Sequence, residues 1–244
     1  FASVDWSQYA TIINASACTA VDLAETDRGR ADAWAVNASA VARLASIAAK
    51  HRIVLVQISS DYVFDGVQSV HDESEAPSPL NVYGQTKAAG DAVVSTLARH
   101  YLVRTSWVVG DGKNFVTTMA RLADQSVQPS VIDDQIGRLS FADDIAEGIK
   151  FLLDSGAEYG TYNLSNTGEP GSWADIAADV FELCGADRAS VIRVSAAEYA
   201  GSGPATPRPK FSTLALDKIL AAGFTPRPSD IALASYLAQY RDGK

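Results

Sequence analysis

The apolar run IVLVQISS (53–60) limits what this chain of 244 residues can fold into more than any other segment. It is rich in β-branched residues and almost continuously apolar, which is typical of a strand buried on both faces of a parallel sheet that carries helices on both sides. Strand-like and helix-like stretches alternate around it, and this alternation predicts an α/β fold. Further strands are expected at 11–16 and 101–109, and helices at 30–50, 81–97 and 114–123.

Beyond about residue 133 the rhythm of strands and helices changes. The sequence therefore predicts a sheet-containing region over 1–133 and a smaller mixed α/β region over 134–244. Ser172 stands where an N-cap is expected at the start of a helix. The expected elements of this part are strands at 129–135, 160–165 and 189–195, helices at 142–153 and 172–184, a Pro/Gly-rich loop at 201–211 and two short closing helices.

The formal net charge of −9 argues against some classes of partner. Nucleic acids and anionic membranes bind clustered Lys and Arg, so neither is expected. Cys18 and Cys184 lie far apart in the sequence, which argues against a disulfide framework and suits a reducing compartment. The three histidines are scattered, and no apolar run reaches the roughly 18 residues of a membrane span. We expect a cytoplasmic protein without a metal site.

The clearest chemical signal is Tyr83-Gly-Gln-Thr-Lys87, within the helix expected at 81–97. A four-residue separation places both side chains on one helix face. There the lysine ammonium favours the phenolate and lowers the pKa of the tyrosine. Such a tyrosine can donate a proton to a carbonyl oxygen or take one from an alcohol. The alternative is a pair on an exposed helix face, which the spacing alone does not exclude.

Ser59, Ser60 and Asp61 follow at the end of the strand expected at 53–60. Ligands of parallel sheets collect at the carboxyl ends of the strands. A serine hydroxyl at this position can donate a hydrogen bond to the same carbonyl oxygen that Tyr83 protonates. The alternative is structural, with two serines that end a strand and an aspartate that caps a turn. The tyrosine and lysine downstream favour the chemical alternative.

Several longer motifs occur in one order and spacing along the chain. They are INASACTAVDLAE (13–25), AVNA (35–38), SSDYVFDG (59–66), SPLNVYGQTKAAGD (78–91), VRTSWVVG (103–110), NFVTTM (114–119) and VIDDQIG (131–137). Together they resemble the dTDP-4-dehydrorhamnose reductase branch of the extended short-chain dehydrogenases. The resemblance covers nearly all of the chain and becomes weaker after about residue 140.

This resemblance implies a Rossmann-like dinucleotide-binding domain with the catalytic residues over 1–133 and a substrate-binding region over 134–244. It implies that NADPH or NADH reduces the 4-keto group of dTDP-4-dehydro-L-rhamnose to give dTDP-L-rhamnose. Ser60 would polarise the carbonyl, Tyr83 would supply the proton, and Lys87 would hold the nicotinamide ribose. A homodimer is also expected, because extended reductases of this type are often dimers. The alternatives are another nucleotide-sugar reductase or epimerase, and a non-catalytic regulatory module of the same fold.

The resemblance also assigns residues around these three. Aromatic residues near strands often only fill the core, and Asn37 is expected to be a buried polar brace and Cys18 a packing residue. The expected cofactor contacts are Asn14, Ala15, Ser16 and Ala17, together with Tyr83 and Lys87. The expected substrate contacts are Thr19, Val21, Asp61, Tyr62, Phe64, Trp107 and Arg208.

The chain departs from the family pattern in several places, and Trp107-Val-Val-Gly, for example, lacks the Tyr often found two places after the Trp. A dinucleotide-binding fold normally opens with a strand, a Gly-rich turn and a helix, but neither G-x-G-x-x-G nor G-x-x-G-x-x-G occurs here. We therefore expect a fragment whose Rossmann-like sheet is incomplete at the N-terminus. Phe211 also replaces the Asn of a family R-P-x-N-S segment, which weakens the assignment of Arg208 as a diphosphate contact.

Overall fold

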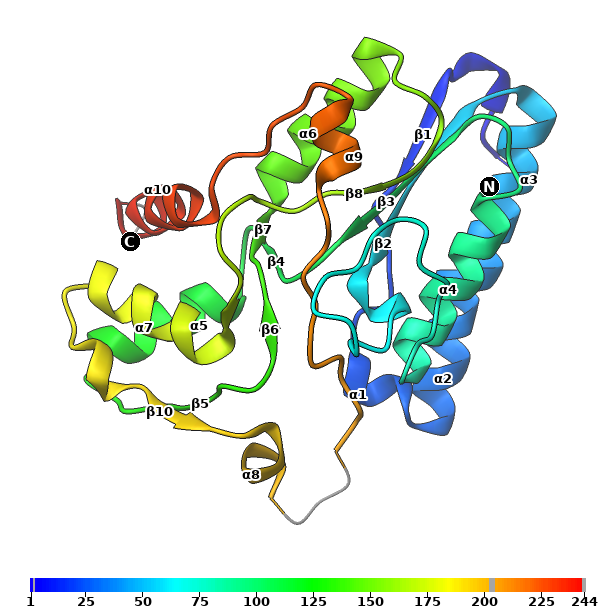
Figure 1. Cartoon of the computed structure of the whole chain (residues 1–244). Coiled ribbons are helices and arrows are strands. Elements are labelled where there is room, and N and C mark those ends of the chain that lie inside the picture. The colour runs from blue at the N-terminus through cyan, green and yellow to red at the C-terminus, as the bar shows by residue number, and fades with distance from the viewer. Residues whose placement is uncertain (2, 202–204, 243–244) are drawn as a thin grey trace.

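The computed structural model describes residues 1, 3–201 and 205–242, and its centre is a four-stranded sheet (Figure 1). The strands lie in the order β1 (Thr11–Asn14), β2 (Val54–Ser60), β3 (His100–Thr105) and β8 (Gly160–Asn163). Every neighbouring pair in this sheet is parallel. The register places Ser60 opposite Thr105, so the carboxyl ends of β2 and β3 meet at one edge. The predicted α/β fold with a parallel sheet is confirmed.

Helices cover both faces of this sheet (Figure 1). Leu55 packs with residues of α3 (Val41–His51) and α4 (Val82–Val94). Val54 and Val56 pack instead with residues of α6 (Ala142–Ser155) and α9 (Asp217–Ala221). Successive residues of a strand point to opposite faces, so β2 must be apolar at every position along this stretch to meet both helical layers. This explains the continuous apolar run in the sequence.

The helix expected at 30–50 is longer and changes its winding. α2 (Asp27–Trp34) follows the short α1 (Val21–Ala24) and continues through a π-helix, η2 (Ala35–Ala40), into α3. A π-helical turn inside an α-helix commonly marks a functional position. Here η2 contains the buried Asn37, and a Cβ on Gly90 of α4 would lie 2.5 Å from the carbonyl oxygen of Asn37. α4 therefore approaches η2 this closely because residue 90 is glycine.

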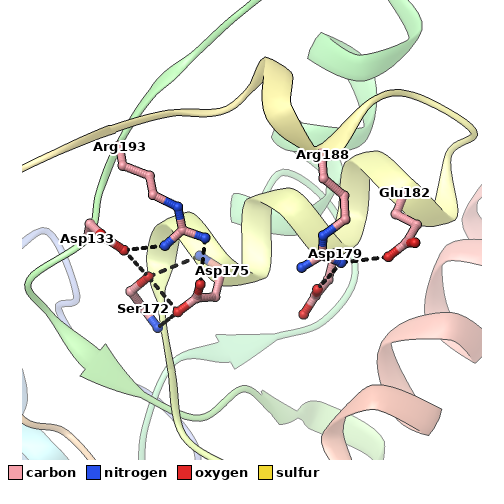
Figure 2. A network of polar contacts seen from close by, with 7 residues as sticks. All are labelled: Asp133, Ser172, Asp175, Asp179, Glu182, Arg188 and Arg193. Atoms are coloured by element: carbon pink, nitrogen blue, oxygen red, sulfur yellow. Dashed lines mark hydrogen bonds and ion pairs between the residues drawn. The ribbon is translucent and has the colours of Figure 1, made fainter.

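A separate apolar core forms where α5 (Phe115–Asp124), α7 (Trp173–Leu183) and α10 (Ser229–Asp242) pack together. Ser172 forms a capping box with Asp175 at the start of α7, which confirms the predicted N-cap. Arg193 forms ion pairs with Asp133 and Asp175 on the surface beside this cap (Figure 2).

Short elements complete the molecule. β5 (Ser130–Ile132) pairs with β10 (Ile192–Val194), β4 (Val108–Val109) with β7 (Ser140–Phe141), and β6 (Ile136–Gly137) with β9 (Gly171–Ser172). The remaining helical segments are η1 (Trp6–Gln8), η3 (Asp61–Val63), η4 (Arg188–Ser190) and α8 (Ala196–Ala200).

Some expected boundaries differ from the structure. The strand expected at 101–109 is broken after Thr105, because Trp107 adopts a left-handed conformation with φ of 44° and β4 then pairs away from the main sheet. The last helix, expected to be short, has 14 residues in α10. Residues 202–204 of the expected loop 201–211 lie outside the described residues. The division at residue 133 stays a prediction, and the sheet takes β8 from beyond it.

Within the described ranges, no helix has both the length and the apolar character that crossing a membrane requires.

Candidate active site

A cavity of about 990 Å³ is lined by residues at the carboxyl ends of β1, β2 and β3. This is the edge at which parallel α/β sheets bind their ligands. Ser60, Tyr83 and Lys87 all line the cavity, so the structure brings together the three residues predicted to be catalytic. The other predicted site residues that line it are Ala15, Ala17, Thr19, Val21, Asp61, Tyr62 and Trp107.

Tyr83 lies in the first turn of α4, and its ring meets that of Tyr62 edge-on, with centroids 5.6 Å apart. Burial raises the pKa of Tyr83 to about 12, although a hydrogen bond with Ser60 acts to lower it. Nearby carboxylates raise the pKa further. The lowered tyrosine pKa expected from the sequence is therefore wrong for this structure, because burial outweighs the hydrogen bond with Ser60. The phenol is held in its protonated form, which is the form that donates a proton.

Lys87 lies one helical turn further along α4 and is 3% exposed. Its Nζ donates a hydrogen bond of 2.6 Å to the carbonyl oxygen of Ile58 in β2. Burial lowers the pKa of Lys87, and the carboxylate of Asp91 acts to raise it. Asp91 in turn forms a buried ion pair with Arg104 of β3, with 3.4 Å between Oδ2 and Nε. The ammonium therefore lies between the end of β2 and a buried charge network.

Ser60 ends β2 and also caps the short helix η3. Its hydroxyl donates to Asp61 Oδ1 at 3.0 Å and accepts a hydrogen bond from the Tyr62 amide at 3.1 Å. Burial raises the pKa of Asp61 to about 6, while hydrogen bonds with Ser212 and Ser60 act to lower it. The structural alternative from the sequence is thus present together with the chemical one, because the same serine caps η3 and lines the cavity.

The segment after β1 contributes only part of its predicted contacts. Ala15 and Ala17 line the cavity, whereas Asn14 and Ser16 lie outside its lining. Asn14 is 8% exposed, and its Nδ2 donates to Gln57 Oε1 of β2 at 2.7 Å. Asn14 therefore fastens β1 to β2, and its role with a cofactor stays a prediction.

Asn37 connects this segment to α4. Its Nδ2 donates to the Cys18 carbonyl at 3.1 Å and to Thr86 Oγ1 at 3.0 Å. Its Oδ1 accepts from the Cys18 amide at 2.8 Å. Thr86 lies between Tyr83 and Lys87 on α4, so Asn37 ties the loop after β1 to that helix. The expected buried polar brace is confirmed.

Aromatic rings form one wall of the cavity. Trp107 stacks on Trp173 with centroids 3.8 Å apart and an interplanar angle of 15°. Phe115 meets Trp173 at 4.6 Å and 60°. A Cβ on Gly137 would lie 2.7 Å from the Trp107 ring, so this ring packs directly on the backbone of β6. All three aromatic residues line the cavity.

Two predicted substrate contacts lie elsewhere. Phe64 is fully buried, stacked on His71 at 4.7 Å and 4°, and outside the cavity lining, so its position is that of a core residue. Arg208 is also absent from the lining, and its Nη2 donates to both carboxylate oxygens of Asp22 at 2.8 and 2.9 Å. Its role as a diphosphate contact stays a prediction that requires this ion pair to open.

Several lining residues carry no signal in the sequence that pointed to a site. Trp173 follows the N-cap Ser172 on a helix that the sequence predicts, but nothing in that position indicates that the ring reaches Trp107. The apolar end of the cavity comes from α6, which the sequence also predicts without a role. The residues not anticipated include Ile13, Ile58, Thr105, Ser106, Asn114, Phe115, Ile145, Ile149, Leu153 and Trp173.

Comparisons with known proteins agree with this geometry. The model of the family described as RmlD substrate binding domain matches residues 2–242. The chain is 38% identical over 241 residues to a dTDP-4-dehydrorhamnose reductase of Aggregatibacter actinomycetemcomitans, covering 94% of this chain and 80% of that protein. It is 37% identical over 236 residues to a dTDP-4-dehydrorhamnose reductase of Mycobacterium tuberculosis (strain ATCC 25618 / H37Rv), covering 93% of this chain and 76% of that protein.

A solved structure is also similar. The crystal structure of dTDP-4-dehydrorhamnose reductase from Bacillus anthracis str. Ames in complex with NADP superposes with a TM-score of 0.84 at 36% identity. The superposition covers 93% of this chain and 79% of that one.

Proposed function

This chain belongs to the RmlD substrate binding domain family of dTDP-4-dehydrorhamnose reductases, and we propose that its cavity reduces the 4-keto group of dTDP-4-dehydro-L-rhamnose to a hydroxyl group. The protein is an NAD(P)H-dependent oxidoreductase of dTDP-rhamnose biosynthesis. The predicted family, fold, enzyme class and cofactor are thereby confirmed, whereas the roles of individual residues are proposals.

One observation carries the assignment of roles. Ser60, Tyr83 and Lys87 come from the end of a strand and from one helix, and they converge on a single cavity at the ligand-binding edge of the sheet. A hydroxyl donor, a protonated phenol and a buried ammonium are the groups that carbonyl reduction needs. Such a set has no evident purpose in a module that only binds a partner.

The chain's own residues act on the carbonyl oxygen. The Ser60 hydroxyl turns its hydrogen from Asp61 Oδ1 to the C4 oxygen, and this hydrogen bond draws electron density from C4. The hydride to C4 would come from NADPH or NADH when that cofactor is bound. The Tyr83 phenol transfers its proton to the same oxygen, which becomes the hydroxyl, and the tyrosine is left as a phenolate. The Lys87 ammonium favours that phenolate until it regains a proton from solvent.

The residues of the cavity floor fit the nicotinamide riboside of such a cofactor. An ammonium has three donors, and the carbonyl of Ile58 accepts from Lys87, so further donors can serve the ribose hydroxyls. Ile13 of β1 and Ile58 of β2 give an apolar surface against which a flat ring can pack. Lys87 would hold the ribose, and these two side chains would orient the ring.

The opposite part of the cavity suits the sugar. Thr19 and Val21 come from the segment after β1, and Tyr62 and Trp107 from the segments after β2 and β3. We assign these four to the deoxysugar, whose hydroxyl and methyl groups match a mixed polar and aromatic surface. Arg208 would reach the diphosphate by exchanging the Asp22 carboxylate for a phosphate oxygen.

The test is NADPH oxidation by the full-length protein with enzymatically made dTDP-4-dehydro-L-rhamnose. In Tyr83→Phe the proton donor is missing while the ring remains, so turnover should fall by about 10²–10⁴-fold. Tyr9→Phe is the matched control, because Tyr9 is 54% exposed and lies outside the cavity lining.

Unchanged turnover in Tyr83→Phe would reject the proposed mechanism. A wild-type protein that binds NADPH but leaves this substrate unreduced would point to another nucleotide sugar, and NMR of the product identifies an epimer or a different alcohol. The homodimer stays a prediction, which sedimentation of the purified protein tests.

A further inference from the structure

Three chemically active side chains follow one another along α4. Tyr83, Lys87 and Asp91 are separated by four residues each, so they lie on one helix face, one turn apart. Tyr83 and Lys87 line the cavity, whereas Asp91 lies behind them, outside the lining. Lys87 and Asp91 are each 3% exposed, so the two charges lie one turn apart and out of contact with bulk water.

Asp91 also forms an ion pair with a cation on a second element, strand β3. Arg104 of β3 is 5% exposed, and its Nε lies 3.4 Å from Asp91 Oδ2. The other carboxylate oxygen, Oδ1, is buried and has no hydrogen-bond partner among the described residues. An arginine stays charged even when buried, so the carboxylate that neutralises it is needed in its ionised form.

A buried ammonium without a nearby negative charge tends to lose its proton. Burial lowers the pKa of Lys87, and Asp91 is the group that acts against this. Burial likewise raises the pKa of Asp91, while Ser59, Arg104 and Lys87 act to lower it. Lys87 and Asp91 therefore depend on one another for their charges, and the permanently charged Arg104 helps to keep Asp91 ionised.

We propose that Asp91 is a positioning residue for the reduction, which acts by keeping Lys87 charged beside Tyr83 and by fixing the catalytic helix to β3 through Arg104. It never touches the substrate. The proposal rests on the proposed function for its catalytic consequence, but the charge state of Lys87 can be measured without any turnover.

Several charged and titratable groups surround Lys87, so a measurement must distinguish the titration of Lys87 from theirs. Tyr83 and Asp91 lie on its own helix, and Arg104 faces Asp91 from β3. Asp61 and Cys18, from the segments after β2 and β1, act on Tyr83. Removing a negative charge lowers the pKa of every acid or cation near it, so Asp91→Asn moves the titration of Lys87 and of Tyr83 in the same direction.

The first experiment follows the lysine ε-carbons by NMR in full-length protein labelled with ¹³C-lysine. The Lys87 signal is assigned by its absence in Lys87→Arg. Its titration midpoint should fall by about one pH unit or more in Asp91→Asn. Asp91→Glu keeps the charge and should keep the midpoint within a few tenths of a unit of the wild type. An unmoved Lys87 midpoint in Asp91→Asn would overturn the proposal.

The second experiment separates charge from packing. Asp91→Asn alone leaves Arg104 buried without its partner, which destabilises the fold. The double variant Asp91→Asn/Arg104→Gln replaces the ion pair with two neutral amides that can bond to each other. We expect the melting temperature of this double variant to return most of the way to that of the wild type. The fall of kcat at high pH should still begin at a lower pH than in the wild type.

If melting temperature and alkaline limb both return in the double variant, Asp91 is only structural and the proposal is overturned. If the wild type itself shows no reductase activity, the proposed function fails, and the NMR titration still decides the role of Asp91.

Discussion

The floor of the cavity, which contains Asp61, and the exposed network around Arg193 both hold aspartates beside hydrogen-bond donors. The pKa values of their carboxyl groups nevertheless shift in opposite directions. Asp61, at the floor, is 3% exposed, and burial raises its pKa to about 6 although hydroxyl donors act to lower it. At Asp175, in the exposed network (Figure 2), burial also acts to raise the pKa. There the hydrogen bonds from the Ser172 backbone and from Arg193 outweigh it, and the pKa is lowered.

The difference shows that exposure to solvent, more than the number of hydrogen-bond partners, determines the direction in which the pKa of a carboxyl group shifts in this molecule. Arg193 bonds Asp133 and Asp175 at 2.6 and 2.7 Å, shorter than the Arg104–Asp91 pair, but its side chain is 46% exposed. Water and salt screen such pairs, and they contribute little to stability. At the floor, burial of the same kinds of groups changes the pKa of a carboxyl group, and the proposed proton transfer depends on such protonation states.

The variant Ser60→Ala, within the cavity, should lose the most activity. The loss of a hydroxyl aimed at a developing oxyanion in a buried site should lower kcat by about 10²–10³-fold. NADPH oxidation with the sugar substrate measures this loss, and a thermal melt shows whether the fold is retained. The control is Ser46→Ala, whose hydroxyl bonds the Ala42 carbonyl on the exposed side of α3 and should leave kcat unchanged. A similar kcat for both variants would contradict the role of Ser60.

A second prediction concerns Asp61 and pH. Its folded pKa of about 6 lies above the ordinary value of 3.8, so the folded state holds the proton more tightly than the unfolded state. The stability that this provides is present at low pH and is lost as pH rises from about 4 to 6, by about 3 kcal/mol. Asp61→Asn removes this dependence.

Urea unfolding of wild type and Asp61→Asn across that range measures the effect. The free energy of unfolding of Asp61→Asn, measured relative to that of the wild type, should increase as pH rises. A difference that stays constant with pH would mean that the Asp61 carboxyl is not perturbed by burial.

The sequence could predict the features that depend on neighbours along the chain. The spacing of Tyr83 and Lys87 follows from helix geometry, and the Ser172 cap follows from residue type and position. It could not predict contacts that depend on how distant segments meet. Trp107 reaches Trp173 only through a left-handed turn, and Arg208 meets Asp22 across 186 residues. The raised tyrosine pKa was missed for the same reason, because burial is a property of the folded chain.

In the exposed network, removal of the central cation should change stability only slightly. Arg193→Gln removes the cation that joins β10 to Asp133 and α7, and it should lower the free energy of unfolding by about 1 kcal/mol or less. At about 1 M salt, where the screening length is only about 3 Å, the difference should largely disappear. Arg28→Gln is the matched control, because the Arg28 side chain is 95% exposed and its pair with Asp32 spans 4.0 Å. A loss of several kcal/mol in the free energy of unfolding that persists at high salt would mean that the network in Figure 2 behaves like a buried one. Solvent exposure would then not explain the difference between the two regions.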